Sequence, residues 1–159
     1  MDILSRADAG IIETAVWILD GLIPETVENI IMVTGNRDIR NGMPADAVFR
    51  RLYNLLSLLR RYRGKGGVVV STLVPDQENC EKIYTIDRVN SDLGLLHEDG
   101  LCLTARYGVL LRQKAHLEWK LAFPTNRMPS TVAAREWYED ICAVAGIGPN
   151  RICLQTFGH

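Results

Sequence analysis

Apolar residues recur at helical spacing in five parts of the chain, with polar residues between them. Between Pro44 and Arg63, valine and leucine positions fall on one helical face and arginines largely on the other. Ser5, Thr104 and Thr131, whose side chains can cap a helix, stand at the start of three of the five stretches. The pattern predicts helices over Ser5–Leu22, Pro44–Arg63, Glu78–Leu96, Ala105–Leu121 and Thr131–Ala145.

Two short runs are continuously apolar and rich in β-branched residues, which is typical of buried parallel strands. They are Asn29–Gly35, closed by Gly-Asn, and Gly67–Val74, broken by Pro75. The tail Asn150–Phe157 has the composition of one more strand. Helix, strand, helix and strand with short connections predict an α/β domain with a parallel sheet and right-handed crossovers.

Composition indicates one globular domain. The chain has 159 residues, of which 47% are hydrophobic and 23% charged, close to the average of soluble domains. No apolar run approaches the roughly 18 to 20 residues that cross a bilayer. The first residues, MDILSRADAG, lack the basic and apolar regions of a secretory signal. We therefore expect a single domain over 1–159 in an intracellular protein, cytoplasmic or nuclear, with no membrane association.

Charge is unevenly spread, although the net charge is only −1. The segment 37–65 holds eight basic residues and two acids, an excess of six. Phe49 and Tyr62 lie among them, and basic groups interleaved with aromatic rings suit phosphate contacts and base stacking. The ordinary alternative is a solvated helix face. The candidate RNA-binding residues are Arg37, Arg40, Arg50, Arg51, Arg60, Arg61, Arg63 and Lys65.

The four cysteines stand singly along the chain. Cys80, Cys102, Cys142 and Cys153 form no C-x-x-C pair and have no histidine at zinc-ligand spacing. We expect free thiols rather than disulfides in an intracellular protein. The sequence predicts no metal site and no cofactor.

Two motifs in the right order resemble blocks of the SGNH/GDSL hydrolases. IIMVTGNRDI, over 30–39, is similar to the block in which a strand ends in a Gly-x-Asn-Asp turn. EDGLCLTARYGVLL, over 98–111, resembles the last block, Asp-Gly-x-His-Leu-Ser/Thr followed by a helix. The resemblance spans about Leu4 to His116. It implies a three-layer α/β/α fold with a short parallel sheet, shortened at its N-terminus, with 117–159 as a helical C-terminal extension.

The resemblance also implies a site that has lost its chemistry. The family needs a serine after the first strand, a Gly and an Asn for the oxyanion, and an Asp-x-x-His pair. No Gly-Asp-Ser strand is expected before the first helix, Arg37 takes the Asn position unless Asn36 is shifted by one, and Cys102 takes the His position. The vestigial positions are Gly35, Asn36, Arg37, Asp38, Asp99 and Cys102.

A degenerate, non-catalytic module is therefore predicted, with a protein partner or homo-oligomer expected. RNA is the other candidate ligand, since non-catalytic domains that resemble this family occur in RNA-associated proteins. Trp17, Trp119 and Trp137 lie on predicted helices and fit either a docking surface or the core.

Three alternatives stay open at the level of sequence. In the first, a missing segment or partner supplies a serine and the protein is an active esterase. In the second, Cys102 is a nucleophile with His97 or His116 as its base. In the third, the C-terminal strand replaces the missing first strand, by permutation or by exchange between protomers.

Overall fold

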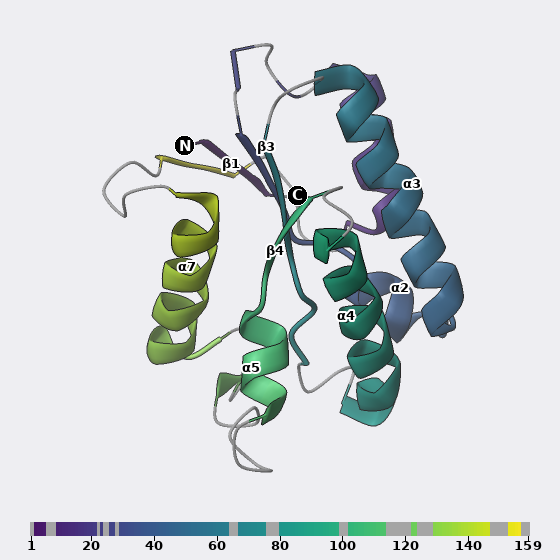
Figure 1. Ribbon diagram of the computed structural model, residues 1–159, viewed down its shortest axis with the longest axis vertical. Coiled ribbons are helices and arrows are strands. Elements are labelled where there is room, and N and C mark those ends of the chain that lie inside the picture. The colour runs from purple at the N-terminus through teal and green to yellow at the C-terminus, as the bar shows by residue number, and fades with distance from the viewer. Residues whose placement is uncertain are drawn as a thin grey trace.

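The computed structural model describes residues 2–5, 9–21, 23, 26–27, 29–63, 67–75, 80–98, 102–113, 122–123, 129–146 and 153–156. Helices and strands alternate along most of this length (Figure 1). In chain order the elements are β1 (Asp2–Ser5), α1 (Ile11–Leu19), β2 (Asn29–Met32), α2 (Asn36–Arg40), α3 (Ala45–Arg63), β3 (Gly67–Ser71), the 3-10 turn η1 (Cys80–Lys82), α4 (Ile83–Glu98), β4 (Leu103–Ala105), α5 (Tyr107–Gln113), α7 (Thr131–Ala145) and β5 (Cys153–Thr156).

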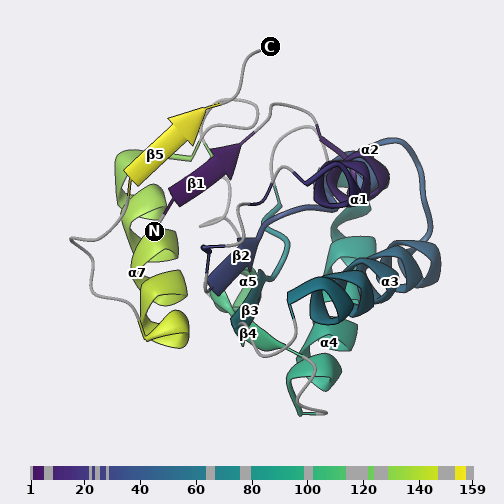
Figure 2. The same ribbon diagram turned by 90° about the horizontal axis from the view of Figure 1, so that it is seen from above.

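The strands form two parallel sheets. The larger sheet has the order β2-β3-β4, with Met32 opposite Val70 and Val69 opposite Leu103. The other pairs β1 with β5, and Asp2 lies opposite Cys153. Figure 2 shows the two sheets side by side, with β1 of the smaller sheet next to β2 of the larger one. All the described strand pairs are parallel, as the sequence pattern predicts.

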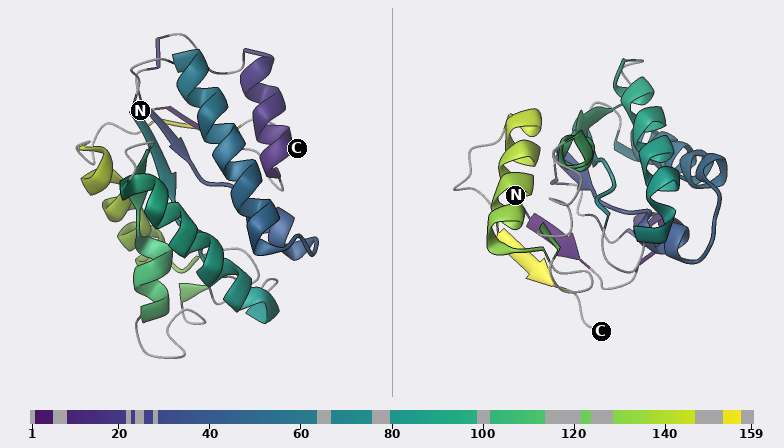
Figure 3. Two further views of the ribbon diagram at one scale, coloured as in Figure 1. Left: turned by 45° about the vertical axis from the view of Figure 1, so that its right-hand side comes forward. Right: turned by 90° about the horizontal axis from the view of Figure 1, so that it is seen from below.

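Helices cover both faces of the sheet. α1, α3 and α4 lie on one face, and α7 packs against β3 and β4 on the other (Figures 1 and 3). The larger core lies under α1, α3 and α4, and a smaller core lies between the sheet, α5 and α7. The predicted three-layer α/β/α class is confirmed. The predicted C-terminal extension includes the helix that covers one face of the sheet.

The helices predicted from the clearest sequence patterns agree best with the structure. In α3 the predicted apolar face is the buried one, and Leu52 and Leu56 are fully enclosed. α7 ends at Gly146, whose φ of 67° is left-handed. Its N-cap is Ser130 rather than the predicted Thr131, because the Ser130 hydroxyl accepts a hydrogen bond from the backbone N–H of Ala133 at 3.2 Å.

The predicted beginning of the chain is wrong in two respects. The first helix begins at Ile11 rather than Ser5, and the strand Asp2–Ser5 precedes it. The reason is tertiary: the Asp38 carboxylate accepts the backbone N–H of Ile11 at 3.1 Å and so sets where the helix begins. Four strand residues are also too few for their alternation to stand out in the sequence.

The predicted helix over Ala105–Leu121 is also displaced. Thr104 does not cap it; Thr104 belongs to β4, and its hydroxyl donates to the Leu93 carbonyl at 3.3 Å. The helix is α5 and begins at Tyr107. Pairing of β4 with β3 decides this, because the backbone of a threonine paired in a sheet is no longer available to start a helix. The segment 114–121 lies outside the described residues.

The predicted C-terminal strand is confirmed as β5. It does not replace a missing first strand, because β1 is present and β5 pairs along it. A second strand beside β1 supplies partners to the backbone groups of one of its edges.

Candidate functional site at the carboxyl edge of the sheet

Open α/β sheets bind ligands beyond the carboxyl ends of their strands. Here that edge carries Gly35–Asp38 after β2 and Thr72–Val74 after β3. The hydrogen bond from Ile11 to Asp38 places the end of the β1–α1 turn beside them. This edge therefore holds four of the six positions predicted as vestigial.

Asn36 connects the ends of two strands. Gly35 before it has a φ of 122°, and a Cβ there would lie 3.2 Å from the Leu73 side chain. The Asn36 side-chain Nδ2 donates to the Val74 carbonyl at 3.0 Å. Its Oδ1 is buried and has no hydrogen-bond partner, and the same is true of Thr34 Oγ1. The amide is thus engaged in holding β2 to β3.

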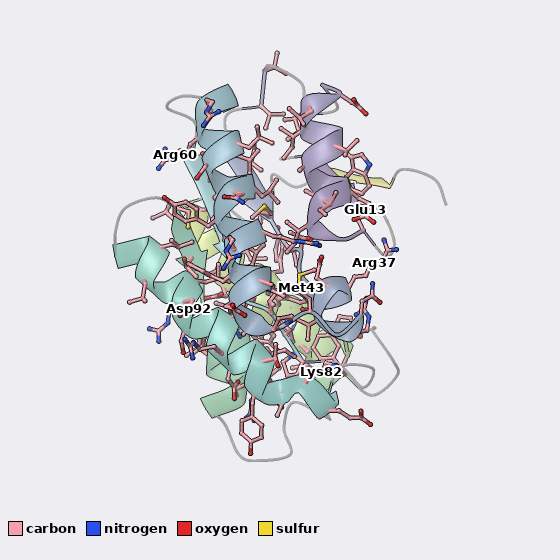
Figure 4. All side chains as sticks on the ribbon, turned by 90° about the vertical axis from the view of Figure 1, so that its right-hand side faces the viewer. Glu13, Arg37, Met43, Arg60, Lys82 and Asp92 are labelled. Atoms are coloured by element: carbon pink, nitrogen blue, oxygen red, sulfur yellow. The ribbon has the colours of Figure 1, made fainter. Side chains whose placement is uncertain are left out.

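Arg37 forms an ion pair with α1. Its guanidinium donates to Glu13 Oε1 of α1 at 2.8 Å, and the two side chains are 39% and 47% exposed. Figure 4 shows this pair at the surface where α2 meets α1. An exposed ion pair of this kind contributes little stability. Of these two neighbouring residues, Asn36 and not Arg37 therefore has its side chain bonded at the end of β3.

Asp38 is a buried structural carboxylate. It is 6% exposed, and its two oxygens accept the Ile11 backbone N–H at 3.1 Å and the Arg51 guanidinium at 3.2 Å. A carboxylate at a helix N-terminus also interacts favourably with the helix dipole. Asp38, in α2, thereby connects that helix to the start of α1 and to α3.

The sequence between β1 and α1 offers no serine, threonine or cysteine. Its residues 6–10 are Arg-Ala-Asp-Ala-Gly, without a hydroxyl or thiol. Gly10 is buried, and a Cβ there would lie 2.7 Å from Glu13 Oε2 and 3.3 Å from Asp38 Oδ2. The hydroxyl of Ser5 belongs to the last residue of the strand itself.

Cys102 lies at the opposite end of the sheet. Cys102 directly precedes Leu103 of β4. In the sheet, Leu103 is paired with Val69 of β3, and Val69 is paired with Ile31 of β2. Gly35 comes four residues after Ile31, so about 15 Å separates Cys102 from it along the strand direction. The structure therefore does not bring Cys102 together with Gly35–Asp38, and Asp99 lies outside the described residues.

The surroundings of Cys102 are those of a structural thiol. It is 3% exposed, and its sulfur lies 3.9 Å from Thr104 Oγ1. Burial raises the pKa of the thiol, while the Thr104 hydrogen bond and the charge of Arg60 act in the lowering direction and are the smaller effects. A buried thiol with a raised pKa is not an activated nucleophile.

His97, the one histidine in the described part of the chain, also lies at this opposite end. Its Nδ1 accepts the backbone N–H of Thr104 at 3.1 Å, so the ring satisfies a donor on β4. It therefore has a structural partner and is distant from Asn36. His116 and His159 lie outside the described residues.

Trp137 belongs to the core rather than to a docking surface. Its Nε1 donates to Ser71 Oγ at 2.7 Å, and its ring stacks on Tyr107 with centroids 6.0 Å apart. Burial, followed by the charge and hydrogen bond of Glu136, raises the pKa of Tyr107 to about 12. Trp17 is half-buried on α1, and Trp119 lies outside the described residues.

The segment after β3 is held by two polar residues that sequence reasoning missed. Asn90 of α4 accepts the Leu73 N–H at 2.7 Å and donates to the Leu73 carbonyl at 2.9 Å. Thr72 Oγ1 accepts the Gly108 N–H at 3.0 Å and donates to the Ala105 carbonyl at 3.1 Å. The sequence signal for the first of these two contacts is an asparagine on the apolar face of α4, where a buried side-chain amide needs hydrogen-bond partners.

The candidate RNA-binding residues do not form one group. Arg37 and Arg51 are ion-paired with acids, and Arg40 and Arg60 also have interaction partners. Figure 4 shows Arg60 near the end of α3 that lies away from α2. The side chain of Arg63, and Lys65 as a whole, lie outside the described residues. Only Arg50 and Arg61 are exposed without a partner among the described candidates.

Within the described ranges, no cluster of three or more histidine, cysteine, aspartate or glutamate side chains is placed to hold a metal ion. None of the helices found there combines the length and the apolar character needed to cross a membrane.

Comparison with known proteins supports the fold. No protein-family model and no curated protein sequence matches the chain. Among solved structures, the chain is similar to a crystal structure described as a member of the lipolytic protein G-D-S-L family from Veillonella parvula DSM 2008. The TM-score is 0.70 at 15% sequence identity, over 86% of this chain and 74% of that one. The protein therefore has a fold similar to that of a G-D-S-L family member.

Proposed function

We propose that this protein is a non-catalytic binding module built on a GDSL-like fold, and that its partner is another protein. The observation that carries the proposal is the sequence between β1 and α1, Arg-Ala-Asp-Ala-Gly, which has no hydroxyl or thiol to serve as the nucleophile. Serine hydrolysis needs that nucleophile with a base within hydrogen-bond reach.

The other polar groups at this edge support the same conclusion. Asn36 is bonded to the Val74 carbonyl, and Asp38 is shared between Ile11 and Arg51. His97, the described histidine, is bonded to β4 at the far end of the sheet. The groups at the edge thus stabilise the fold, and the described part of the chain places no histidine beside them to serve as a base.

We expect no ester hydrolysis above buffer background with p-nitrophenyl acetate, and no change when Ser5 or Asn36 is replaced by alanine. Enzymes accelerate reactions by about 10⁶-fold or more, so even a weak hydrolase is visible in this assay. The measurement is the initial rate over a range of substrate concentrations, with an active esterase as the positive control. Saturable hydrolysis that Ser5→Ala abolishes would establish the hydrolase alternative instead.

RNA is a second candidate partner, favoured by one feature of α3. Arg50 and Arg61 lie eleven residues apart on the same exposed face, about 16 Å along the helix. Tyr53, which is 45% exposed, lies between them. Two unpaired guanidinium groups and an aromatic ring suit backbone phosphates and a stacked base. Asp46 on the same face weakens this patch.

For RNA binding through this face, we expect Arg50→Glu with Arg61→Glu to lower the affinity for a single-stranded oligonucleotide at least tenfold at low salt. The reason is that two phosphate contacts become repulsions. Arg135→Glu, on α7 across the sheet, is the matched control and should change little. Fluorescence anisotropy at two salt concentrations measures the effect. Equal affinity of the double variant and the wild type would show that this face of α3 is merely solvated and does not bind RNA.

A further inference from the structure

The outer face of α1 is apolar. Ile12, Val16 and Leu19 are 53%, 46% and 54% exposed, and their spacing of four and three residues places them on one side of the helix. The opposite side is buried through Ile11 and Ile18. α1 is therefore apolar on the face that meets the core and on much of the face that meets solvent.

Such a helix is unusual at a protein surface. A surface helix normally pairs an apolar face with a polar one. In α1 the only charged residue is Glu13, which is bonded to Arg37. Three half-exposed branched side chains present an apolar patch on the order of 300 Å², within the range in which the largest patch of a monomer is often functional.

Asp20 is a second, independent observation at the same face. It is the C-cap of α1 and it is exposed, and no ion pair joins it to another residue in the part of the chain that the structure describes. The last turn of α1 holds no basic residue. A carboxylate there meets the negative end of the helix dipole, which is unfavourable. Asp20 would gain a favourable interaction from a cation, and it lies beside the exposed apolar side chains of α1. A positively charged group on a partner would supply that interaction.

We infer that the outer face of α1 binds an amphipathic helix of a partner protein, with an apolar ridge against Ile12, Val16 and Leu19 and a lysine or arginine against Asp20. The inference deepens the proposed binding function and rests on it. It names the surface and the chemistry of the partner: apolar anchors flanked by positive charge.

Charge and area select this occupant over a second copy of the chain. In a two-fold antiparallel pairing through Val16, Asp20 of one copy approaches the start of the other α1, where Arg37 is already ion-paired with Glu13, so this contact offers Asp20 no unpaired cation among the described residues. The patch is also far smaller than the roughly 800 Å² that each partner of a stable interface buries. A single docked helix fits both the area and the charge.

The test uses two labelled peptides of about four helical turns. Both carry leucines at helical spacing; one has lysines on its other face and the second has glutamates. We expect the full chain to bind the lysine peptide at least tenfold more tightly than the glutamate peptide in fluorescence anisotropy. Equal affinities for the two peptides would overturn the role of Asp20.

Three variants locate the binding on the molecule. Val16→Ser with Leu19→Ser should weaken the lysine peptide at least tenfold, and Asp20→Lys at least threefold. Glu139→Lys makes the same charge change on α7, at an exposed site, and should have no effect. Thermal melting confirms that each variant folds, since all these side chains are exposed or half-exposed.

Several results would contradict the inference. Unchanged affinity in the double serine variant would remove α1 from the interface, and an equal loss in Glu139→Lys would show non-specific charge attraction. A dimer in light scattering that the serine variant abolishes would assign the face to a second copy. None of these results depends on ester hydrolysis, so a failed docking surface and a failed non-catalytic function are separate outcomes.

Discussion

Replacement of Gly108 by alanine is expected to lower the free energy of unfolding by at least about 3 kcal/mol, the size of a severe overpacking defect. Gly108 is buried in α5, where the chain passes over the end of β3. A Cβ there would overlap the Leu73 carbonyl oxygen and lie 2.9 Å from both the Leu73 carbonyl carbon and Thr72 Oγ1. These contacts are largely with backbone, which cannot give way as a flexible side chain does.

A matched glycine separates this clash from helix propensity. Gly94 lies inside α4, and a Cβ there meets nothing within 4 Å. Gly94→Ala should therefore stabilise the protein by about 0.5 to 1 kcal/mol. Urea denaturation followed by circular dichroism measures both variants. A Gly108→Ala protein as stable as the wild type would mean that α5 does not pass so close to β3.

Replacement of Asn90 by alanine is expected to cost about 3 kcal/mol, because two buried backbone groups lose their partner at once. The Asn90 side chain is 3% exposed and bonds both the N–H and the carbonyl of Leu73. Leu73 itself is 2% exposed, so water cannot readily replace the amide. The variant also leaves a small cavity.

Two further variants give this prediction its controls. Ser91→Ala, at an exposed position of the same helix, should change stability by less than about 0.5 kcal/mol. Asn90→Asp keeps an acceptor for the Leu73 N–H but loses the donor to its carbonyl, so its cost should be substantial as well. Hydrogen exchange at the Leu73 amide should accelerate in Asn90→Ala. If neither the exchange rate of the Leu73 amide nor the free energy of unfolding changed, the two Asn90–Leu73 hydrogen bonds would not contribute to stability.

Both predictions concern the segment that leaves β3 at the carboxyl edge of the sheet. Asn90 and Gly108 hold it from two sides, and Asn36 binds the next carbonyl along, that of Val74. The polar groups at this edge therefore stabilise the connection between strand and loop. The surface that we propose for binding is a different one, the outer face of α1.

Much of the fold could be predicted from local patterns. The apolar periodicity of α3 and the β-branched runs of β2 and β3 predict those elements, because each pattern is long or concentrated enough to stand out. β1 was missed because four residues carry too little periodicity. The start of α5 was missed because β4 pairs with β3, and a cap-like threonine does not reveal a strand.

The candidate site could be predicted less well. Asn36 and Asp38 lie at the carboxyl edge of the sheet, and Arg37 between them is bonded to Glu13 of α1. Cys102 lies at the other end of the sheet from Asn36, although the two motifs stand in family order along the chain. Cys102 comes directly before β4, and a residue that precedes a parallel strand lies at the amino edge of the sheet. The sequence pattern predicted a helix from Ala105 and did not reveal this short strand.

By itself, then, the sequence determined the α/β class, the parallel strands and the buried face of α3. All of these depend on residue identity or on periodicity within one element. Only the tertiary structure decided that Asp38 starts α1, that β5 joins β1, that Cys102 is a buried thiol far from Asn36, and that one face of α1 remains apolar in solvent. Each of these depends on contacts between residues distant in the chain, which no local pattern encodes.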